Sequence, residues 1–497
     1  PASRYYHCFA DQKNSADYAY AFGVNEFVLC ASAYQPWIDK YPGSTAGGKH
    51  YCLNRNNTYW EYSRPFWDYQ ARCSALMRKG VPVVDICVYL GQNPPVKLVT
   101  YRLPEIPEGY DFDVCTAEAL VGRTMAVDGR LTLPTGISYS LLVIQRNNDM
   151  PLHVLRHIAG LVKGGVIVCG PRPDGSDSLK DKAESEEYRA LVDELWGELT
   201  TVSQIRKVGK GKIYENIPLS EVLKYENIRP DIAIKSGNTA KDKVYFVHRR
   251  LSDADVYFLN NHSDRAFHDT VRLRTDARQA EYWDAVTGQR YMIPVKASGE
   301  KGMLLNLTLA PRESGFIVTS NNQATGLLPI IADVQETITP IEGSWNVYFD
   351  PRWGGPGKVV FDELIDWTVH ADTGIRYYSG TAVYHKELNL AIPAQNERLL
   401  LRFPRLGSLA RVWVNGKEVV TVWCSPWEAD ITSYVHEGKN NLKIEVVNSL
   451  MNRMIGDASL PESERFTYAY PQIATPTDKL VPSGIMEQLN LVYRQCQ

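Results

Sequence analysis

The sequence predicts a multidomain protein, with α/β domains in the first half of the chain and all-β domains in the second. Three observations predict this. The chain has 497 residues, whereas a single hydrophobic core stops growing near about 250–300 residues. Helical spacing alternates with short apolar runs as far as about residue 225. Beyond it, short strands of alternating polarity follow one another between turn residues. We therefore expect three or four domains.

Residues 1–100 predict the C-terminal part of a (β/α)8 barrel. Helical spacing at 13–23 and 63–80 alternates with the apolar runs VNEFVLCASA (24–33) and VPVVDICVYLG (81–91), and the longest loops come after the strands. This alternation is typical of such barrels, whose chemistry lies at the carboxyl ends of the strands. Only about two units are present where a barrel needs eight. We therefore expect the other units upstream or on another chain.

Residues 101–225 predict a small α/β domain of the flavodoxin- or amidotransferase-like kind. The strand SYSLLVIQ (138–145) precedes a helix at 150–165, and the strand VIVCGPRP (166–173) precedes another helix at 185–199. Such alternation is typical of a doubly wound parallel sheet. We interpret this domain as architectural.

Residues 226–325 and 335–497 predict two all-β domains joined by the polar stretch SNNQATG (320–326). In the first, runs such as KVYFVHRR and DVYFLNN alternate with turn residues and predict an antiparallel sheet. In the second, Asn415-Gly416 separates two alternating strands, which indicates a hairpin because both residues tolerate positive φ. A further turn before LKIEVVN completes the pattern of short strands expected of a jelly-roll sandwich.

Charge and composition argue against several classes of function. The chain carries 54 Lys and Arg against 57 Asp and Glu, a net charge of −3, without a basic stripe, so we expect no nucleic acid partner. No run approaches the roughly 20 apolar residues of a membrane span. The nine cysteines form no C-x-x-C pair and mostly lie in apolar runs, which indicates buried free thiols. The sequence starts without Met or a signal peptide, and we expect a piece of a longer protein.

Several strings at both ends of the chain point to one enzyme family. Near the N-terminus these are FGVNEFVLCASAYQPW (22–37), WDYQARCSALMRKG (67–80) and PVVDICVYLG (82–91). Near the C-terminus they are DWTVHADTGIRYYSGTAVYHKEL (366–388) and SPWEADITSYVHEGKNNLKIEVVN (425–448). The chain resembles glycoside hydrolase family 106, the α-L-rhamnosidases, over essentially its whole length. The first strings resemble the last strands of the family's catalytic barrel, and the others resemble its closing galactose-binding-like sandwich.

The resemblance implies an inverting α-L-rhamnosidase that acts on rhamnose-containing oligo- or polysaccharide, in the bacterial periplasm or secreted, with a Ca²⁺ ion at its active site. An inverting enzyme needs a carboxylic acid and a carboxylate about 6.5–9.5 Å apart. The resemblance places both upstream of Pro1, which makes the missing N-terminal part of the same enzyme a partner of this chain. The family more often carries a His at the position of Cys30 and another near Tyr34.

Candidate substrate-binding residues lie at the loops of the barrel-like region. Tyr34, Gln35 and Trp37 follow an apolar strand, where strand ends supply substrate contacts in barrels. We predict sugar binding there, with a structural loop as the alternative. Trp60 could stack on a sugar, and Glu61 could bind hydroxyls or a metal. The alternative is that Glu61 is a helix N-terminal acid stabilised by the helix dipole.

Polar residues within apolar elements give further candidates. Asp85 interrupts an apolar strand, and a buried carboxylate costs free energy unless it is paired or used. We predict substrate binding by Asp85, with a buried ion pair to Arg72 as the alternative. Asp68 and Arg72 stand four apart on a helix, a spacing typical of an intrahelical ion pair. Cys169 ends a strand as a nucleophile would, but the nearby histidines lie on the preceding helix, which argues against catalysis.

The C-terminal sandwich also carries candidates. Trp413, Trp423 and Trp427 form either a sugar-stacking surface or, because alternation turns most rings inward, part of the core. One acidic tract supplies the hard oxygen ligands that calcium prefers, although its spacing matches no defined loop. Its carboxylates belong to Asp362, Asp366 and Asp372.

Two functions follow from the sequence. The first is a glycosidase, an α-L-rhamnosidase of which this chain is the C-terminal portion. The second is a noncatalytic carbohydrate-binding or scaffold protein. Barrel strands with two acidic residues before Pro1 would identify the enzyme.

Overall fold

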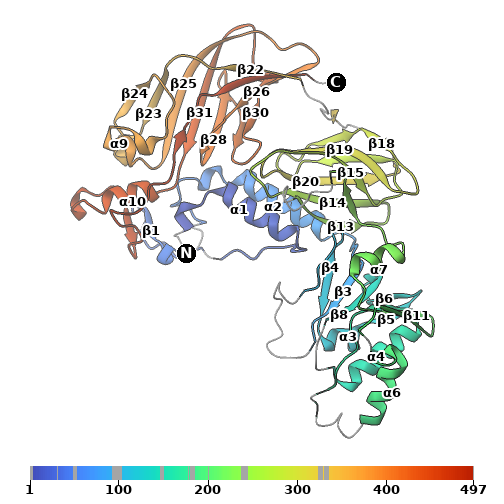
Figure 1. The fold of residues 1–497 in the computed structure, drawn as a ribbon. Helices are drawn as coiled ribbons and strands as arrows, with labels where there is room; N and C mark the ends of the chain where they lie inside the picture. The colour runs from blue at the N-terminus through green and yellow to red at the C-terminus, as the bar shows by residue number, and fades with distance from the viewer. Residues whose placement is uncertain are drawn as a thin grey trace.

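The computed structural model consists of several packed bodies around a pair of N-terminal helices (Figure 1). A β-sandwich of C-terminal residues lies at the top of the view, a second all-β body lies beside it, and a mixed α/β domain extends below. The predicted mixture of α/β domains and a β-sandwich is therefore confirmed. The structure describes residues 4–30, 32–48, 53–91, 103–145, 150–176, 178, 185–199, 201–236, 244–322, 328–329 and 335–495.

The N-terminal helices α1 (Phe9–Tyr20) and α2 (Arg64–Met77) share one hydrophobic core with both all-β bodies. Phe9 and Phe66 stack with ring centroids 4.8 Å apart. Trp423 of the sandwich meets Phe66 edge-on at 5.7 Å, and Phe258 of the second all-β body meets Tyr20 at 5.8 Å. All five rings are buried. Because burying such a side chain stabilises by roughly 1.5–3 kcal/mol, this shared core holds the bodies together.

The run at 24–33, for which a strand is predicted, forms none among its described residues in this structure. The described residues of this run belong to neither a helix nor a strand, and Val28 is 97% exposed. An apolar strand is stable only when neighbouring strands bind its backbone and cover its side chains. The described part of the chain supplies no such neighbours. Described residues before 91 form three short strands and no barrel: β1 (Pro42–Ser44), β2 (Val81–Pro82) and β3 (Ile86–Tyr89).

The run at 81–91, predicted as the end of the barrel, is divided between two other sheets. β2 pairs with a strand of the second all-β body. β3 lies inside the six-stranded sheet of the α/β domain, of order β10-β11-β9-β8-β3-β4, where it pairs in parallel with β4 and β8. Every residue of β3 is buried. Such a run suits any central parallel strand, so the sequence did not show which sheet it joins.

Helices cover the faces of this sheet. On α4 (Leu152–Lys163), the buried Leu155, Ile158 and Val162 recur at helical spacing and pack in the domain's core. The other helices are α3 (Ala117–Arg123), α6 (Ser185–Trp196) and α7 (Leu219–Tyr225). The remaining strands of the sheet are β4 (Phe112–Cys115), β8 (Leu141–Ile144), β9 (Ile167–Cys169), β10 (Gln204–Val208) and β11 (Gly211–Glu215). A small antiparallel sheet contains β5 (Met125–Val127), β6 (Arg130–Thr132) and β7 (Ser138–Tyr139).

The second all-β body consists of two mainly antiparallel sheets. Their orders are β12-β15-β19-β18 and β2-β13-β14-β20-β16-β17-β21. Of the polar stretch predicted as a linker at 320–326, residues 323–326 lie outside the described residues. The strands are β12 (Ile232–Ile234), β13 (Val244–Arg250), β14 (Ala254–Asn261), β15 (Phe267–Leu273), β16 (Gln279–Trp283), β17 (Arg290–Ile293), β18 (Val295–Ala297), β19 (Met303–Leu309), β20 (Ser314–Ser320) and β21 (Leu328–Pro329).

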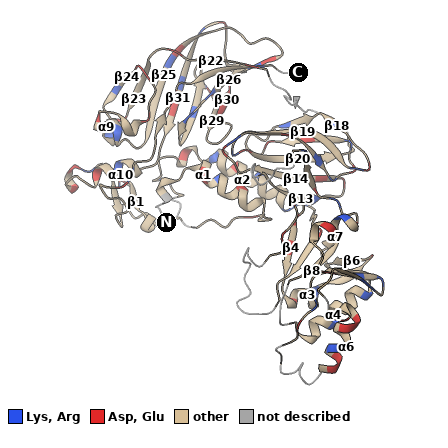
Figure 2. Ribbon diagram, viewed as in Figure 1, with Lys and Arg blue, Asp and Glu red and all other residues tan. Residues whose placement is uncertain are grey.

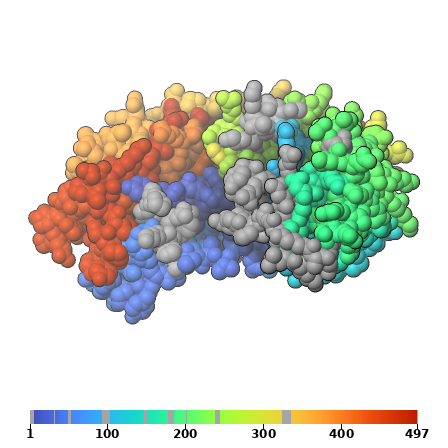
Figure 3. Space-filling view, turned by 60° about the horizontal axis from the view of Figure 1, so that its bottom comes forward, coloured from blue at the N-terminus to red at the C-terminus, as the bar shows by residue number. Residues whose placement is uncertain are grey.

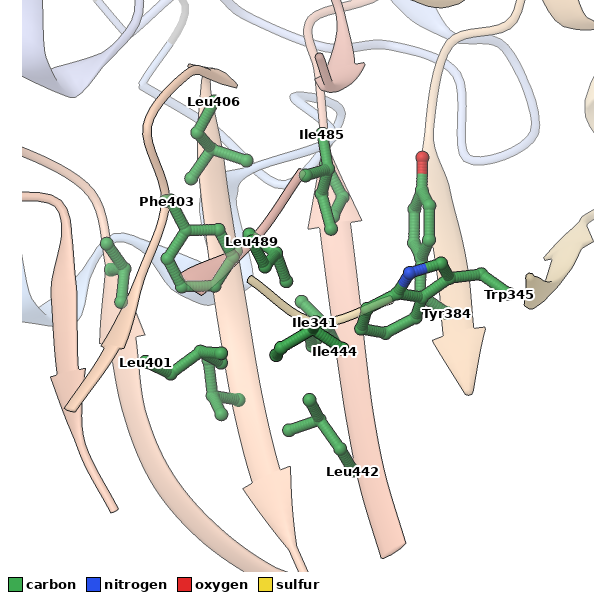
Figure 4. Packing of buried hydrophobic residues seen from close by; sticks show 14 of the residues in the cluster. Ile341, Trp345, Tyr384, Leu401, Phe403, Leu406, Leu442, Ile444, Ile485 and Leu489 are labelled. Carbon is green, nitrogen blue, oxygen red and sulfur yellow. The ribbon is translucent and has the colours of Figure 1, made fainter. Parts of the chain in front are cut away.

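The C-terminal sandwich packs a sheet of order β24-β23-β25-β31-β28-β29 on one of order β22-β34-β26-β30. Side chains such as Trp345, Tyr384 and Ile444 point from the sheets into one core (Figure 4). The predicted hairpin is present, because Asn415 and Gly416 both have positive φ between β28 and β29. The strands are β22 (Glu336–Pro340), β23 (Trp345–Phe349), β24 (Gly357–Phe361), β25 (Thr381–Leu390), β26 (Glu397–Arg402), β28 (Leu409–Val414), β29 (Lys417–Val422), β30 (Glu428–Asp430), β31 (Gly438–Val447) and β34 (Asn490–Gln495).

Smaller elements connect the sandwich to the rest of the molecule. The strand β32 (Tyr468–Tyr470) pairs with β1, so the C-terminal region touches the N-terminal loop. In Figure 3 the corresponding red and blue surfaces meet. The other elements are β27 (Leu406–Gly407), β33 (Gly484–Ile485), α9 (Thr373–Arg376) and α10 (Met451–Asp457).

Burial and charge agree with several expectations. Cys73, Cys87, Cys169 and Cys424 are buried, as predicted for thiols in apolar runs, whereas Cys30 is exposed. Acidic and basic residues are interspersed over the fold (Figure 2). None of the described helices combines the length and the apolar character needed to cross a membrane.

Candidate functional site

The pairing of β1 with β32 brings aromatic side chains from both ends of the chain together. Trp37 meets Tyr468 edge-on with ring centroids 5.0 Å apart and lies 6.5 Å from Tyr470. The Lys40 ammonium lies 4.0 Å from the centroid of the Tyr468 ring and 5.5 Å from that of Trp37. Cation and ring attract each other at these distances. We call these residues, with the exposed Tyr34 that precedes Trp37 by three positions in the chain, the aromatic rim.

The aromatic rim is accessible from solvent. Tyr34 is 83% and Tyr470 63% exposed, while Trp37 is half-buried by its neighbours. Flat amphipathic rings with polar tips suit the apolar faces and hydroxyl groups of sugars. Of the predicted sugar contacts, Tyr34 and Trp37 therefore lie where a sugar could reach them. The contribution of Tyr470 was missed, because pairing with a segment about 430 residues away leaves no local signal in the sequence.

Gln35, in contrast, is buried and holds the loop that follows it. Its side-chain oxygen accepts from the Ser44 N–H at 2.9 Å, and its amide donates to the Ser44 carbonyl at 2.8 Å. Gly43 has φ +72°, and a Cβ there would lie 2.4 Å from the Gln35 oxygen. Asn56 also donates to this oxygen, at 3.3 Å. These contacts show the structural loop that was the alternative to sugar binding at this residue.

Trp60 and Glu61 lie in the short 3-10 helix η3 (Trp60–Tyr62), directly before α2. Trp60 is 36% exposed and meets Trp67 edge-on at 6.5 Å. The Glu61 side chain is exposed in the first turn of η3. The backbone carbonyl of Glu61 accepts a hydrogen bond from the Arg411 guanidinium at 3.0 Å. The position of the carboxylate fits the helix N-terminal acid that was the alternative to sugar or metal binding.

Asp85 is buried in an ion-pair network between the α/β domain and the second all-β body. One carboxylate oxygen accepts from Arg274 at 2.5 Å. The other accepts from Ser140 at 2.6 Å and lies 3.4 Å from Arg130. This is the buried ion pair that was the alternative to substrate binding, but the predicted partner Arg72 is wrong. Because Arg274 is 189 residues away, the sequence carried no signal for this partner.

The network continues around a buried histidine. Both ring nitrogens of His248 face carboxylate oxygens. Nδ1 lies 2.7 Å from an Asp231 oxygen, and Nε2 lies 3.1 Å from an Asp255 oxygen. Arg274 also pairs with Asp231, at 2.6 Å. Burial alone would raise the pKa of Asp255, but hydrogen bonds from His248 and Thr275 and the charge of His248 lower it to about 2. A single histidine inside the apolar strand β13 was the available signal in the sequence.

The ion pair predicted between Asp68 and Arg72 is wrong. Asp68 lies 3.6 Å from Arg64 on the same helix, and Arg72 instead donates to the carbonyls of Ala285 and Val286, each at 3.0 Å. Residues one turn apart in either direction are equally close on a helix. Arg72 is drawn away because a neighbouring loop exposes two carbonyls to it.

Among the described residues no cluster of acidic side chains marks the site of the calcium ion implied by the resemblance. Nowhere within the described ranges do three His, Cys, Asp or Glu side chains gather closely enough to hold a metal. In the acidic tract, Asp366 accepts from the Thr368 N–H and Asp372 from the Gly374 N–H. Both therefore act as helix N-caps.

The thiol of Cys169 is unsuited to catalysis. Burial, with a smaller effect of the Glu226 charge, raises its pKa to about 12. A nucleophilic cysteine needs the opposite shift, because the thiolate is the reactive species. The argument against a catalytic Cys169 therefore holds in the structure.

The raised pKa of the Asp111 carboxyl predicts that the free energy of unfolding depends on pH. Burial raises this pKa to about 7 against the hydrogen bond from Phe112, which lowers it, and the charges of Asp113 and Asp231 add smaller increases. In the unfolded chain this carboxyl titrates near about 3.9. The folded protein thus holds a proton that the unfolded chain has lost, so stability falls as pH rises from about 4 to about 7. Asp111→Asn, which keeps the acceptor for Phe112, is expected to be more stable than the parent at pH 8 by about 1 kcal/mol or more.

Urea unfolding of both proteins at pH 4 and pH 8 tests this expectation. The variant should gain little at pH 4, where the carboxyl is neutral in the folded state. An equal change at both pH values would contradict it.

Comparisons with known proteins point in one direction. Residues 2–296 match the family model described as α-L-rhamnosidase, glycoside hydrolase family 106, and residues 332–493 match the sugar binding domain of glycosyl hydrolases family 2. A rhamnosidase from Novosphingobium sp. PP1Y superposes with a TM-score of 0.89 and 28% identity, over 99% of this chain and 46% of its own. A protein of Formosa agariphila named "Putative beta-glucuronidase" is 23% identical over 91% of this chain and 57% of its own length. The chain spans about half the length of these relatives.

Proposed function

The chain belongs to the α-L-rhamnosidase family, glycoside hydrolase family 106, and from this we propose that it acts as part of an inverting α-L-rhamnosidase on rhamnose-containing oligo- or polysaccharide. The family match and the rhamnosidase fold support a glycoside hydrolase. Inversion of the anomeric configuration, the rhamnose-containing substrate and a periplasmic or secreted location belong to the proposal.

The observation that carries the proposal is an exposed apolar segment that leads directly into the aromatic rim. A protein surface rarely exposes so many large apolar side chains along one segment unless they bind something. We propose that this segment becomes a strand of the catalytic barrel when further strands of the same enzyme pair with it. Strand ends in a barrel face the substrate, so the aromatic rim would then lie at the mouth of the active site. The exposed fractions are 57% for Phe22, 37% for Val24, 97% for Val28, 50% for Leu29 and 85% for Ile38.

In this proposal the chain supplies substrate binding and the further strands supply the acid and base. Inversion requires one carboxylic acid that protonates the leaving oxygen and one carboxylate that activates water on the opposite side of the sugar. The ring faces of the aromatic rim would hold the sugar and exclude water from part of its surface. A calcium ion remains part of the proposal, with no ligands assigned to it in the described part of this chain.

Hydrolysis of a 4-nitrophenyl α-L-rhamnoside by the complete enzyme tests the activity. We expect release of nitrophenol and, by NMR at early times, β-L-rhamnose as the first product, because inversion changes the anomeric configuration. First release of the α-anomer would contradict inversion. Turnover of a β-D-glucuronide in place of the rhamnoside would overturn the proposed substrate. Binding of sugar without any turnover would favour the noncatalytic carbohydrate-binding protein.

Tyr470 tests the position of the aromatic rim. In the complete enzyme, Tyr470→Ala is expected to raise KM for a rhamnose-containing oligosaccharide roughly 5- to 10-fold with little change in kcat, because it removes a binding surface and no reacting group. Tyr225→Ala is the matched control, since Tyr225 is 70% exposed on α7 in the α/β domain. Equal effects of both substitutions would contradict a specific role of the aromatic rim.

A further inference from the structure

A pocket of about 530 Å³ lies on the outer face of the larger sheet of the C-terminal sandwich. Its base is a row of side chains that crosses four strands. In register, Asn346 on β23 neighbours His385 on β25, which neighbours Lys443 on β31, which neighbours Trp413 on β28. We call it the outer-face pocket. It differs from the aromatic rim, which is formed by β1, β32 and the loop before β1.

Alternation along the strands turns these side chains away from the core. Tyr384, one residue before His385, and Ile444, one residue after Lys443, are fully buried inside the sandwich. His385 and Asn346 are exposed, and Trp413 is partly exposed. Of the three tryptophans considered as a sugar-stacking surface, Trp423 is 2% exposed and belongs to the core. Only Trp413 of the three lines the outer-face pocket.

The Trp413 ring is held in position by its neighbours. The Lys443 ammonium lies 3.7 Å from its ring centroid, and the Arg411 guanidinium lies 5.8 Å away. Arg411 is in turn covered by Tyr62 of the N-terminal region at 4.1 Å, and Tyr62 donates to Glu445 at 3.1 Å. Tyr62 therefore covers Arg411 and Glu445, the neighbouring row of outward side chains, and bounds the outer-face pocket on that side. A ring held in this way loses little freedom when it binds a ligand.

The charged side chains that line the outer-face pocket are all engaged by neighbours. The Lys386 ammonium donates to the carbonyls of Gly343, at 2.6 Å, and Ser344, at 2.9 Å. Lys443 pairs with Glu445 at 3.1 Å, and Glu387 pairs with Lys439 at 3.0 Å. Burial and the Lys443 charge both lower the pKa of His385 below its usual value, so its ring is neutral at pH 7 and offers one donor and one acceptor. An ionic ligand would therefore have to compete with these existing partners, whereas a neutral ligand would not.

Two amides add further donors and acceptors. The side chains of Asn346 and Asn441 line the pocket and form no hydrogen bond with any other described residue. Each amide offers both a carbonyl oxygen and two N–H donors. Hydroxyl groups need both kinds of partner. We infer that the outer-face pocket binds a neutral oligosaccharide, which packs a sugar face on Trp413 and bonds its hydroxyls to Asn346, His385 and Asn441.

Binding to neutral and uronate-containing oligosaccharides on a glycan array, followed by calorimetry with cellohexaose, xylohexaose and any other neutral binder, tests this inference. In the complete protein, Trp413→Ala is expected to weaken binding of the neutral ligand at least 10-fold, and His385→Ala and Asn441→Ala by smaller factors. Tyr348→Ala is the matched control, because Tyr348 is a 41% exposed ring of β23 outside the pocket. Hydrolysis of an aryl rhamnoside should be unchanged in Trp413→Ala, which separates this site from the proposed active site.

Three results would overturn the inference. They are the absence of any neutral binder, binding confined to uronates that is lost at high salt, and equal weakening by Trp413→Ala and Tyr348→Ala. Unchanged thermal unfolding of His385→Ala and Asn441→Ala shows that any loss of binding arises from the pocket and not from misfolding.

Discussion

Replacing Lys13 by Met is expected to lower the free energy of unfolding by about 3–5 kcal/mol, because it leaves a buried carboxylate without its cation. Lys13 is 1% and Asp17 0% exposed, and their charged atoms are 2.7 Å apart. Lys13 also donates to Ser314 at 2.8 Å, and Tyr69 donates to Asp17. Burial alone would lower the pKa of Lys13, but Asp17 raises it above its ordinary value, so Lys13 keeps its positive charge at neutral pH. The pair connects α1 and α2 to β20.

Equilibrium urea unfolding measures this effect, and the chain offers a matched control. Arg64 and Asp68 form the same kind of pair four residues apart, but Arg64 is 89% exposed. Arg64→Met should change stability by about 0.5 kcal/mol or less, as exposed pairs do. The double change Lys13→Met with Asp17→Leu should recover part of the loss, because no charge is then left buried. A loss below about 1 kcal/mol in Lys13→Met would refute the expected role of the pair.

Replacing Arg274 by Leu is expected to cost about 3 kcal/mol or more and to loosen the α/β domain from the second all-β body. Arg274 lies between the carboxylates of Asp85, which is 4% exposed, and Asp231, which is 0% exposed. Without the guanidinium these two buried negative charges are left to His248 and to a longer contact with Arg130. Like charges in a buried site destabilise it strongly.

Urea unfolding and hydrogen exchange of the segments around Asp85 and Asp231 measure the two parts of this expectation. Arg272→Leu is the control, because Arg272 stands two residues earlier and is half-buried. Among the described residues its side chain forms one hydrogen bond, a 3.5 Å contact with the Lys301 carbonyl. It should change stability by about 1 kcal/mol or less. Faster exchange in Arg274→Leu should appear on both sides of the domain boundary. Faster hydrogen exchange confined to the second all-β body would show that the network does not connect it to the α/β domain.

The buried ion pairs and the shared aromatic core both connect the N-terminal helices to the all-β bodies. Phe9 and Phe66 of the N-terminal helices pack on Trp423 of the sandwich, while Lys13 and Asp17 bind the second all-β body through Ser314. The helices therefore fix the positions of both all-β bodies. In the proposed enzyme they also fix where the segment after α1 begins, and hence where the aromatic rim lies.

The sequence by itself determined the features that depend on neighbouring residues. Amphipathic spacing predicted the helices at 13–23, 63–80 and 150–165, and the Asn415-Gly416 turn predicted the hairpin, because both signals are contained in a few consecutive residues. The strings quoted above were sufficient for the rhamnosidase family. Burial of four of the seven described cysteines also followed from their apolar surroundings.

Tertiary structure alone decided which segments pair and which polar groups meet. The apolar run at 24–33 forms no strand, because a strand exists only with partners, and the run of β3 joined the α/β sheet instead of a barrel. Asp85 found Arg274 in place of Arg72, and Tyr470 came to Trp37 through β1 and β32. Contacts between residues hundreds of positions apart depend on how whole bodies pack, and no local pattern of residue types records that packing.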